Sequence, residues 1–394
     1  MKFNFDKTVN RFNTDSLKWD EMRKFYPNAK EDPIAMWVAD MDFEVAPCIV
    51  DALHERVDHR IFGYSSEENM EYNKAIQKWM IDRHDWHVDH ESVFFSPGVI
   101  PALGYLINLM TKPGDGIIIQ QPVYYPFAYL TKGNDRKIVD NTLVCVDGDY
   151  KMDYDDLEEK LKDPNNKLMI FCSPHNPVGR VWSKEELAKM LDLCKKYDMP
   201  VISDEIHFDL TRVGVKHTVL ETIDPSYKDK IVTCTAPSKT FNLAGLQNAN
   251  IIINDKKLRE DWLYFTRHVA HLDGHSTFGA VGNLAAYEKG AEWLDELKVY
   301  LDGNIEYLKT FFAEHMKELK VIDCQATYLV WVDFTGLGMT DEEIDKIMIE
   351  EAGVLLDTGT CFGEPGRGYQ RFNIACPRET IEKALDSIKI AFNK

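Results

Sequence analysis

The sequence of 394 residues contains no uninterrupted apolar run that is long enough to cross a membrane. Its first residues, MKFNFDKTVNRFN, have no apolar core of the kind that a secretion signal needs. Basic residues are outnumbered, because 46 Lys and Arg stand against 65 Asp and Glu and give a formal net charge of -19. Such an acidic chain is a poor partner for nucleic acid or an anionic membrane. We therefore expect a cytoplasmic protein that holds any anionic ligand through local groups.

The eight cysteines form no CxxC pair, and no repeat or low-complexity linker interrupts the chain. Most of the cysteines lie in apolar stretches such as IFCSP and IVTCTA, so we expect reduced core residues and neither a zinc site nor a disulfide framework. What the chain does contain is 44% hydrophobic and 11% aromatic residues. This content is sufficient for a folded protein of two domains.

Strand and helix patterns alternate through the middle of the chain. Helical spacing at 45–60, 68–84, 102–110, 126–133, 154–161 and 184–197 is interleaved with apolar β-rich runs at 92–96, 116–120, 137–144, 167–173 and 200–203. This alternation predicts an α/β fold with a mainly parallel central sheet. Beyond residue 278, long helical patterns with few strands predict a smaller α+β domain. We expect an arm and part of the small domain at 1–45, a large domain at 46–285 and the small domain at 286–394.

One lysine, Lys239, is the residue around which the other motifs make sense. It lies in the segment APSKTFN (236–242), between the apolar runs at 231–235 and 249–253. A lysine on a short connection between two core strands is partly desolvated, which lowers its pKa and frees its amine to act as a nucleophile or base. That is the requirement for a Schiff-base lysine, whereas a single lysine taken alone is more often an exposed turn residue.

Three other predicted strands also end in polar residues. SPGVI (96–100) places Gly98 where a helix begins, and its free N–H groups can bind phosphate. CSPHNPVGR (172–180) presents Asn176 between two prolines, and SDEIH (203–207) places Asp204 directly after a buried strand with His207 three residues on. Because a buried carboxylate is costly without a cation, we expect Asp204 to face one. Taken alone, each motif is also compatible with an ordinary turn, and His207 with a core histidine.

Together these strand ends match the needs of one cofactor, pyridoxal phosphate, because ligands of α/β sheets collect at the carboxyl ends of strands. Pyridoxal phosphate requires a lysine for its aldehyde, a carboxylate for its ring nitrogen, donors near its phenolic oxygen, a stacking aromatic and an N–H cradle for phosphate. The aromatic would come from QPVYYP (121–126). No metal ion is needed by this set.

At this point the chain resembles, nearly end to end, the fold-type I pyridoxal-phosphate enzymes of the aminotransferase class I/II group. Within that group it is most similar to the MalY/PatB branch of cystathionine β-lyases, also called C-S lyases. The resemblance is carried by NTDSLKWD (13–20), WVADMDF (37–43), SPGV (96–99), SPHNPVGR (173–180), DEIH (204–207) and APSKTFN (236–242).

The resemblance implies roles for individual residues. Lys239 would bind the cofactor covalently and later move the α-proton, Asp204 would pair with the ring nitrogen, and Asn176 would donate to the phenolic oxygen. Tyr124 would stack on the ring, and Arg371 would form a fork with the substrate carboxylate. Phosphate would be held by three residues: Gly98, Val99 and Ser238.

A homodimer with a shared active site is implied as well, since Tyr64 matches a tyrosine that reaches the phosphate of the partner subunit. Two positions depart from the wider aminotransferase pattern. His207 stands where many relatives have a tyrosine, and we expect it to donate a hydrogen bond to the cofactor. Gln247 stands where many have a phosphate-binding arginine, so phosphate would be held by fewer charges.

The implied activity is α,β-elimination of L-cystathionine or a related L-cysteine S-conjugate, which yields a thiol (homocysteine from cystathionine), pyruvate and ammonia. A pyridoxal-phosphate aminotransferase is the alternative, because it shares the first steps and differs in where the proton returns. A regulatory protein that keeps the fold and binds a partner is a third possibility. The amino-acid substrate would be a small molecule in every enzymatic case.

Overall fold

The computed structural model describes residues 1–66, 70–272 and 274–393. Its largest element is a seven-stranded sheet in which β10 runs antiparallel to its neighbours β2 and β9, while the other pairings are parallel. This arrangement confirms the predicted mainly parallel sheet. In sheet order, the strands are β2 (Val93–Ser96), β10 (Ala249–Ile253), β9 (Ile231–Thr235), β8 (Val201–Asp204), β7 (Asn166–Cys172), β3 (Gly116–Ile119) and β4 (Lys137–Asp140).

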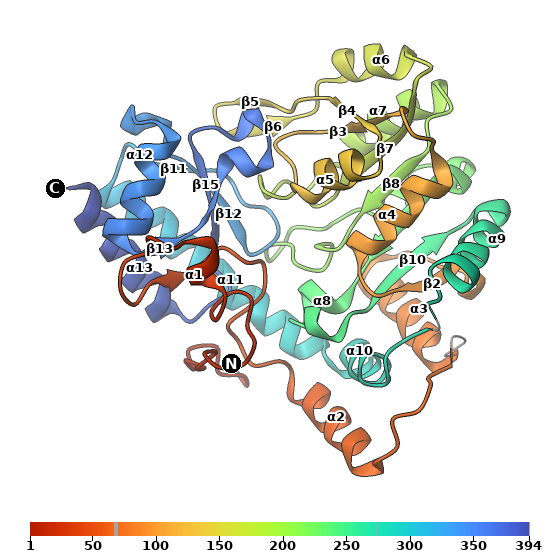
Figure 1. Cartoon of the computed structure of the whole chain (residues 1–394), viewed down its shortest axis with the longest axis horizontal. Helices are drawn as coiled ribbons and strands as arrows, with labels where there is room; N and C mark the ends of the chain where they lie inside the picture. Colours follow the sequence, from red (N-terminus) through yellow and green to blue (C-terminus); the bar gives the residue numbers. More distant parts are fainter. Residues whose placement is uncertain (67–69, 273, 394) are drawn as a thin grey trace.

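Helices surround this sheet, as the alternating pattern predicted (Figure 1). They begin at favourable residues: Ser183 and Glu186 form a capping box at the start of α7, and Pro126 occupies the first position of α5. The first two residues of the predicted helix 68–84 lie outside the described part of the chain. The helices are α2 (Pro47–His59), α3 (Met70–His84), α4 (Val99–Met110), α5 (Pro126–Gly133), α6 (Tyr154–Lys162), α7 (Lys184–Lys196), α9 (Lys256–Tyr264) and α10 (Thr277–Lys289).

A second, four-stranded sheet is antiparallel and lies to one side of the first, at the left of Figure 1. Its strands are, in sheet order, β11 (Lys320–Val321), β12 (Leu329–Asp333), β15 (Tyr369–Asn373) and β14 (Asp357–Thr358). Its helices are α11 (Ala291–His315), α12 (Asp341–Lys346) and α13 (Arg378–Phe392). Segregated helices on an antiparallel sheet make this the smaller α+β part that the sequence predicted.

The N-terminal arm lies against the four-stranded part (Figure 1). It contains α1 (Met22–Phe25) and β1 (Ile34–Ala35), and β1 pairs in parallel with β13 (Val354–Leu355). Just beyond β1, the amide of Asp42 donates a 2.8 Å hydrogen bond to the carbonyl of Ala375. These contacts bring the segment 37–43 from one end of the chain beside β15 from the other.

Several features differ from the sequence prediction. The predicted strand 137–144 is shorter, because β4 ends at Asp140 and residue 144 begins a separate hairpin of β5 (Val144–Val146) and β6 (Asp149–Lys151). Helix α9 was not predicted at all. Five of the eight cysteines are buried, but Cys145 and Cys361 are exposed.

Two searches of the described residues gave no result. None of their helices has both the length and the apolar character that a membrane span requires. They also contain no group of three or more His, Cys, Asp or Glu side chains that could hold a metal ion.

Candidate active site

The carboxyl ends of β2, β7, β8 and β9 meet at one edge of the large sheet, where a cavity of about 160 Å³ opens. This is the place at which α/β sheets bind ligands. Of the ten residues predicted for the site, eight line this cavity: Gly98, Val99, Tyr124, Asn176, Asp204, His207, Ser238 and Lys239. Arg371 lies behind Asn176, and Tyr64 lies elsewhere.

Lys239 reaches the cavity from α8 (Pro237–Thr240), a single helical turn that follows β9. Its Nζ donates a 2.7 Å hydrogen bond to the carbonyl of Ala39 in the N-terminal arm. Burial lowers the pKa of Lys239 to about 8, with Arg371 acting in the same direction, and the attraction of Asp40 only partly opposes this. About one tenth of the amine is therefore neutral at pH 7, far more than for a lysine with the ordinary pKa of 10.5, and this fraction is available as a base or nucleophile.

Asp204 is the last residue of β8 and is only 3% exposed. Its carboxylate accepts a hydrogen bond from the amide of Ile206 at 3.1 Å, but it forms no ion pair with any described residue. Burial raises the pKa of Asp204 to about 7, and the charge of Lys239 reduces this shift only in part. The cation that a buried carboxylate requires is thus not supplied by a bonded protein side chain.

His207 and Asn176 also present polar atoms toward the cavity. His207 is 3% exposed, its Nδ1 has no hydrogen-bond partner among the described residues, and burial holds its pKa well below the usual value. His207 is therefore neutral. Asn176 uses its Oδ1 to accept a 3.1 Å hydrogen bond from Nη1 of Arg371. Asn176 lines the cavity, and because its Oδ1 is engaged by Arg371, its Nδ2 is the atom that could donate to a bound acceptor.

The helix that begins after Gly98 contributes backbone to the same cavity. Val99 and Ile100 are the first residues of α4, and their amides belong to the first turn, which has no intrahelical acceptors. Space is tight there, since a Cβ at Gly98 would lie 3.3 Å from Cδ of Pro101. The N-terminus of a twelve-residue helix and the Ser238 side of α8 thus form a cradle suited to an anion.

Two predicted residues need separate mention. Tyr124 is half-buried at the cavity wall, with its ring centroid 5.2 Å from that of Tyr125. Tyr64 is 99% exposed and does not line the cavity of its own chain. Gln247 is exposed and is likewise absent from the cavity wall.

Sequence reasoning missed other parts of the site. Ala39 contributes a backbone carbonyl, which leaves no side-chain signature. Asn248 lines the cavity and is held by Tyr72, whose hydroxyl accepts from Nδ2 at 2.7 Å, and by His275, whose Nδ1 lies 3.0 Å from Oδ1. The signal that could have found Asn248 is its place immediately before the apolar strand β10, near Lys239 in the chain.

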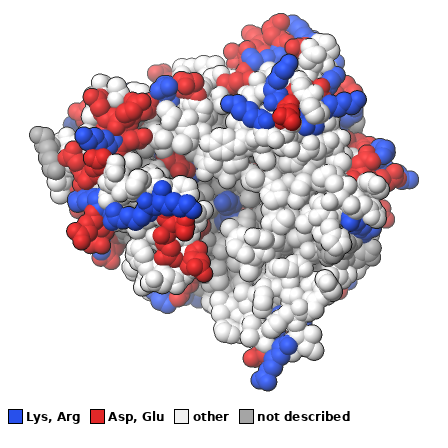
Figure 2. All heavy atoms as spheres, viewed as in Figure 1, with Lys and Arg blue, Asp and Glu red and all other residues white. Residues whose placement is uncertain are grey.

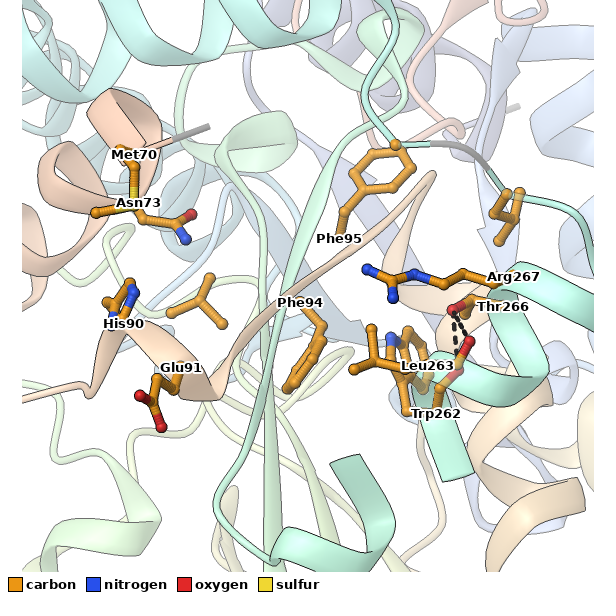
Figure 3. Close-up of a pocket in the computed structure, with 13 residues that line it drawn as sticks. Met70, Asn73, His90, Glu91, Phe94, Phe95, Trp262, Leu263, Thr266 and Arg267 are labelled. Atoms are coloured by element: carbon orange, nitrogen blue, oxygen red, sulfur yellow. Dashed lines mark hydrogen bonds between the residues drawn. The ribbon is translucent and has the colours of Figure 1, made fainter. Parts of the chain in front are cut away.

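A larger cavity of about 300 Å³ lies on the outer side of β2 and contains none of the predicted residues (Figure 3). It is bounded by the start of α3, by β2, and by α9 with the π-helical turn η5 (Phe265–Val269). Phe94 and Trp262 lie at its floor, and Thr266 donates to carbonyls of its own helix at 2.8 and 3.4 Å. The titratable residues of this lining are His90, Glu91 and Arg267, and neither a lysine nor an aspartate is among the described residues that line it.

Comparisons with known proteins agree with this geometry. The family model for aminotransferase class I and II matches residues 31–388. Cystathionine beta-lyase PatB of Bacillus subtilis is 42% identical over 99% of this chain and 100% of its own length. Protein MalY of Escherichia coli is 34% identical over 97% of each chain.

Among solved structures, cystalysin from Treponema denticola superposes with a TM-score of 0.95 at 40% identity, over 100% of this chain and 99% of that one. That crystal structure contains a pyridoxal 5'-phosphate cofactor. The fold is therefore that of a fold-type I pyridoxal-phosphate enzyme. The chain belongs to the aminotransferase class I and II family.

Proposed function

We propose that the protein is a pyridoxal-phosphate-dependent carbon–sulfur β-lyase that acts on L-cystathionine or a related L-cysteine S-conjugate. One observation carries this: Lys239, with a pKa near 8, shares a cavity with the uncompensated Asp204, in a chain 42% identical end to end to a cystathionine beta-lyase. Relatives named cystathionine beta-lyase and a structure named a C-S lyase support this reaction. A 44% identical structure from Clostridium difficile, however, is named a putative aminotransferase, so transamination is the alternative that the experiment must test.

The residues of the cavity fit pyridoxal phosphate. Asp204 is a buried carboxylate without a bonded cation, which the protonated ring nitrogen would supply. His207 Nδ1 is a buried atom without a partner, and a phenolic oxygen or a bound water would give it one. The α4 amides and Ser238 would hold phosphate, with Gly98 and Val99 at the point of closest approach. Tyr124 would stack on the ring.

Once bound, pyridoxal phosphate draws electrons away from Cα of the amino acid and so acidifies the α-proton. Lys239 would hold the cofactor until the substrate amine displaces it, and the freed amine, in its neutral form, would then take the α-proton. The Cβ–S bond breaks, the sulfur leaves as a thiol, and one water is consumed when pyruvate and ammonia are released. Asp204 would pair with the protonated ring nitrogen, whose positive charge would favour the ionised carboxylate.

Arg371 and Asn176 would orient the substrate. Arg371 is 1% exposed and bonded to Asn176, so both side chains are fixed before the substrate arrives. A guanidinium binds a carboxylate through two parallel N–H groups, which sets the direction of Cα as well as the affinity. The α-carboxylate of the amino acid is the group that Arg371 would bind.

We further propose a homodimer in which Tyr64 completes the phosphate site of the partner subunit. Tyr64 follows α2, which extends outward from the body in Figure 1, and its neighbours Ile61 and Phe62 are also exposed. Figure 2 shows a broad area with few charged side chains on the face that carries α4, α8 and α10. An area of this kind in a chain of net charge -19 favours a protein interface.

The domain division at 1–45, 46–285 and 286–394 is likewise a proposal. It is supported by the strand order, since every strand of the large sheet falls within 93–253 and every strand of the small sheet within 320–373. The acidic composition favours a cytoplasmic location.

The decisive experiment mixes the purified, cofactor-loaded protein with L-cystathionine and no keto acid, and follows pyruvate and free thiol together. We expect sustained release of both in equal amounts. If turnover requires an added keto acid, the protein is an aminotransferase and the proposal fails. If neither condition gives turnover while cofactor is bound, cystathionine is the wrong substrate or the chain serves a regulatory role.

A further inference from the structure

The guanidinium of Arg371 is enclosed by three acceptors from three different parts of the chain. Nη1 donates to Oδ1 of Asn176 at 3.1 Å, and Nη2 donates to the carbonyl of Trp37 at 3.1 Å and to a carboxylate oxygen of Asp357. Asp357 is the only charged residue in this set. It was not among the residues that sequence reasoning placed in the site.

Asp357 stands directly opposite Arg371 in the antiparallel pairing of β14 with β15. Side chains at facing positions of two antiparallel strands lie close together, so opposite charges at such positions attract each other. Asp357 is 7% exposed, and the Phe362 ring lies 4.9 Å from the guanidinium carbon. The pair is thus fixed by the sheet register and by packing.

The negative charge of Asp357 stabilises the buried guanidinium of Arg371. A guanidinium that is 1% exposed is costly to bury when its neighbours are only neutral carbonyls and an amide. Burial raises the pKa of Asp357, and the charge of Arg371 opposes that rise. Three of the five guanidinium N–H groups are committed, and Nε has no partner among the described residues.

We propose that Asp357 is a positioning residue: by accepting from Nη2 it fixes the orientation of the Arg371 guanidinium toward the substrate carboxylate, and it thereby sets the preference for amino acids over amines. This inference rests on the proposed function, in which Arg371 binds the α-carboxylate. The opposite role, a carboxylate that competes with the substrate for Arg371, makes the reverse prediction for the same variant.

Asp345 offers a matched control. It is a partly buried aspartate whose pKa is also raised by burial, and it borders the same neighbouring cavity as Asp357. Its carboxylate accepts from Nε2 of Gln370 at 2.8 Å, whereas the ion pair of Arg371 is with Asp357. The change Asp345→Asn therefore removes a comparable aspartate carboxylate but leaves the ion pair of Arg371 with Asp357 intact.

The experiment compares L-alanine with ethylamine, which share an amine and differ in the carboxylate. Both are titrated into the cofactor-loaded enzyme, and the dissociation constants are read from the cofactor absorbance. In Asp357→Asn we expect the preference for L-alanine over ethylamine to fall about tenfold or more, because the charged group that holds the guanidinium in its orientation is gone. Ethylamine binding should be unchanged, and Asp345→Asn should keep the wild-type preference.

Steady-state kinetics with S-methyl-L-cysteine provide a second readout. Asp357→Asn should raise KM with a smaller change in kcat, and Asp357→Glu, which restores the charge, should recover part of the loss. If Asp357→Asn does not fold, Asp357→Glu is titrated in its place and must shift the preference in the same direction by less. An unchanged preference, a stronger one, or an equal fall in Asp345→Asn each overturns the positioning role.

These outcomes are separable from a failure of the proposed function. The titrations measure binding and need no turnover. A wild-type enzyme that prefers L-alanine but releases no thiol would overturn the lyase proposal alone. A wild-type enzyme that releases thiol and pyruvate, with the preference intact in Asp357→Asn, would overturn the role of Asp357 alone.

Discussion

Replacing Asp204 by asparagine should stabilise the cofactor-free protein at alkaline pH and weaken cofactor binding. In the structure, burial raises the pKa of Asp204 to about 7, against an ordinary value of 3.8. Between pH 3.8 and about pH 7, the carboxyl group of Asp204 is therefore protonated in the folded state and ionised in the unfolded state. Stability contributed by this group is lost as the pH rises from about 4 to about 7 and stays low above that range.

The size of the effect follows from the shift. A change of one pKa unit corresponds to about 1.4 kcal/mol, so a shift from 3.8 to about 7 costs the folded protein on the order of 4 kcal/mol at pH 8. At pH 5 only the part of the shift between 3.8 and 5 counts, and the cost is on the order of 2 kcal/mol. Asparagine keeps an oxygen for the Ile206 amide and carries no charge.

Urea unfolding of the cofactor-free wild type and Asp204→Asn, at pH 5 and pH 8, measures this directly. We expect the variant to be more stable at both pH values and the gap to widen at pH 8. A gap that is absent, or that narrows toward pH 8, would show that the buried carboxylate already has a cation and that the argument is wrong.

Adding pyridoxal phosphate should reverse the order of stability, so that the wild type becomes more stable than Asp204→Asn. Removing one member of a buried charge pair costs roughly 3–5 kcal/mol, which corresponds to a loss of cofactor affinity of roughly 10²- to 10³-fold or more. Titration followed by cofactor absorbance gives the dissociation constants. Equal affinity in wild type and Asp204→Asn would remove Asp204 from the ring-nitrogen role.

Three further outcomes are expected. Lys239→Ala should abolish both turnover and the absorbance of lysine-bound cofactor, and retained turnover would contradict the whole assignment. Arg371→Ala should raise KM by about a hundredfold, since charged hydrogen bonds contribute roughly 1.5–3 kcal/mol each, and an unchanged KM would exclude the carboxylate role. Glu221 is buried away from the cavity, and its pKa is raised to about 7. Glu221→Gln should therefore flatten the fall in stability between about pH 4.5 and 7 but leave cofactor affinity as in wild type. Unfolding curves test the first expectation, and a cofactor titration tests the second.

Much of the fold could be predicted because its elements are periodic. The helix predicted at 126–133 is α5 (Pro126–Gly133), since a proline at the first position and an apolar face mark it clearly. Helix α9 escaped because eight of its nine residues are not fully buried and only Trp262 is, so its apolar stripe is too thin to recognise. The β5–β6 hairpin escaped because its residues are mostly exposed.

Some parts of the site could likewise be predicted from the sequence, and others could not. That Lys239, Asp204 and Asn176 line one cavity could be predicted, because each lies at or just beyond the carboxyl end of a strand in a mainly parallel sheet, and such ends converge by topology. The carbonyls of Ala39 and Trp37 could not, because backbone groups have no sequence signature. Asp357 could not either, since its meeting with Arg371 depends on the register of two short strands that the sequence does not specify.

The contacts of the N-terminal arm determine when the site can exist during synthesis. Ala39 and Lys239 are 200 residues apart, and Trp37 and Arg371 are 334 apart. Because a ribosome makes the chain from its N-terminus, the arm cannot form these contacts until almost the whole polypeptide has been synthesised. A nascent chain that stops before β15 can complete its large sheet yet lacks Arg371, the residue that we propose binds the substrate carboxylate. Premature release of such a fragment would leave a cofactor-binding sheet without its substrate-binding half.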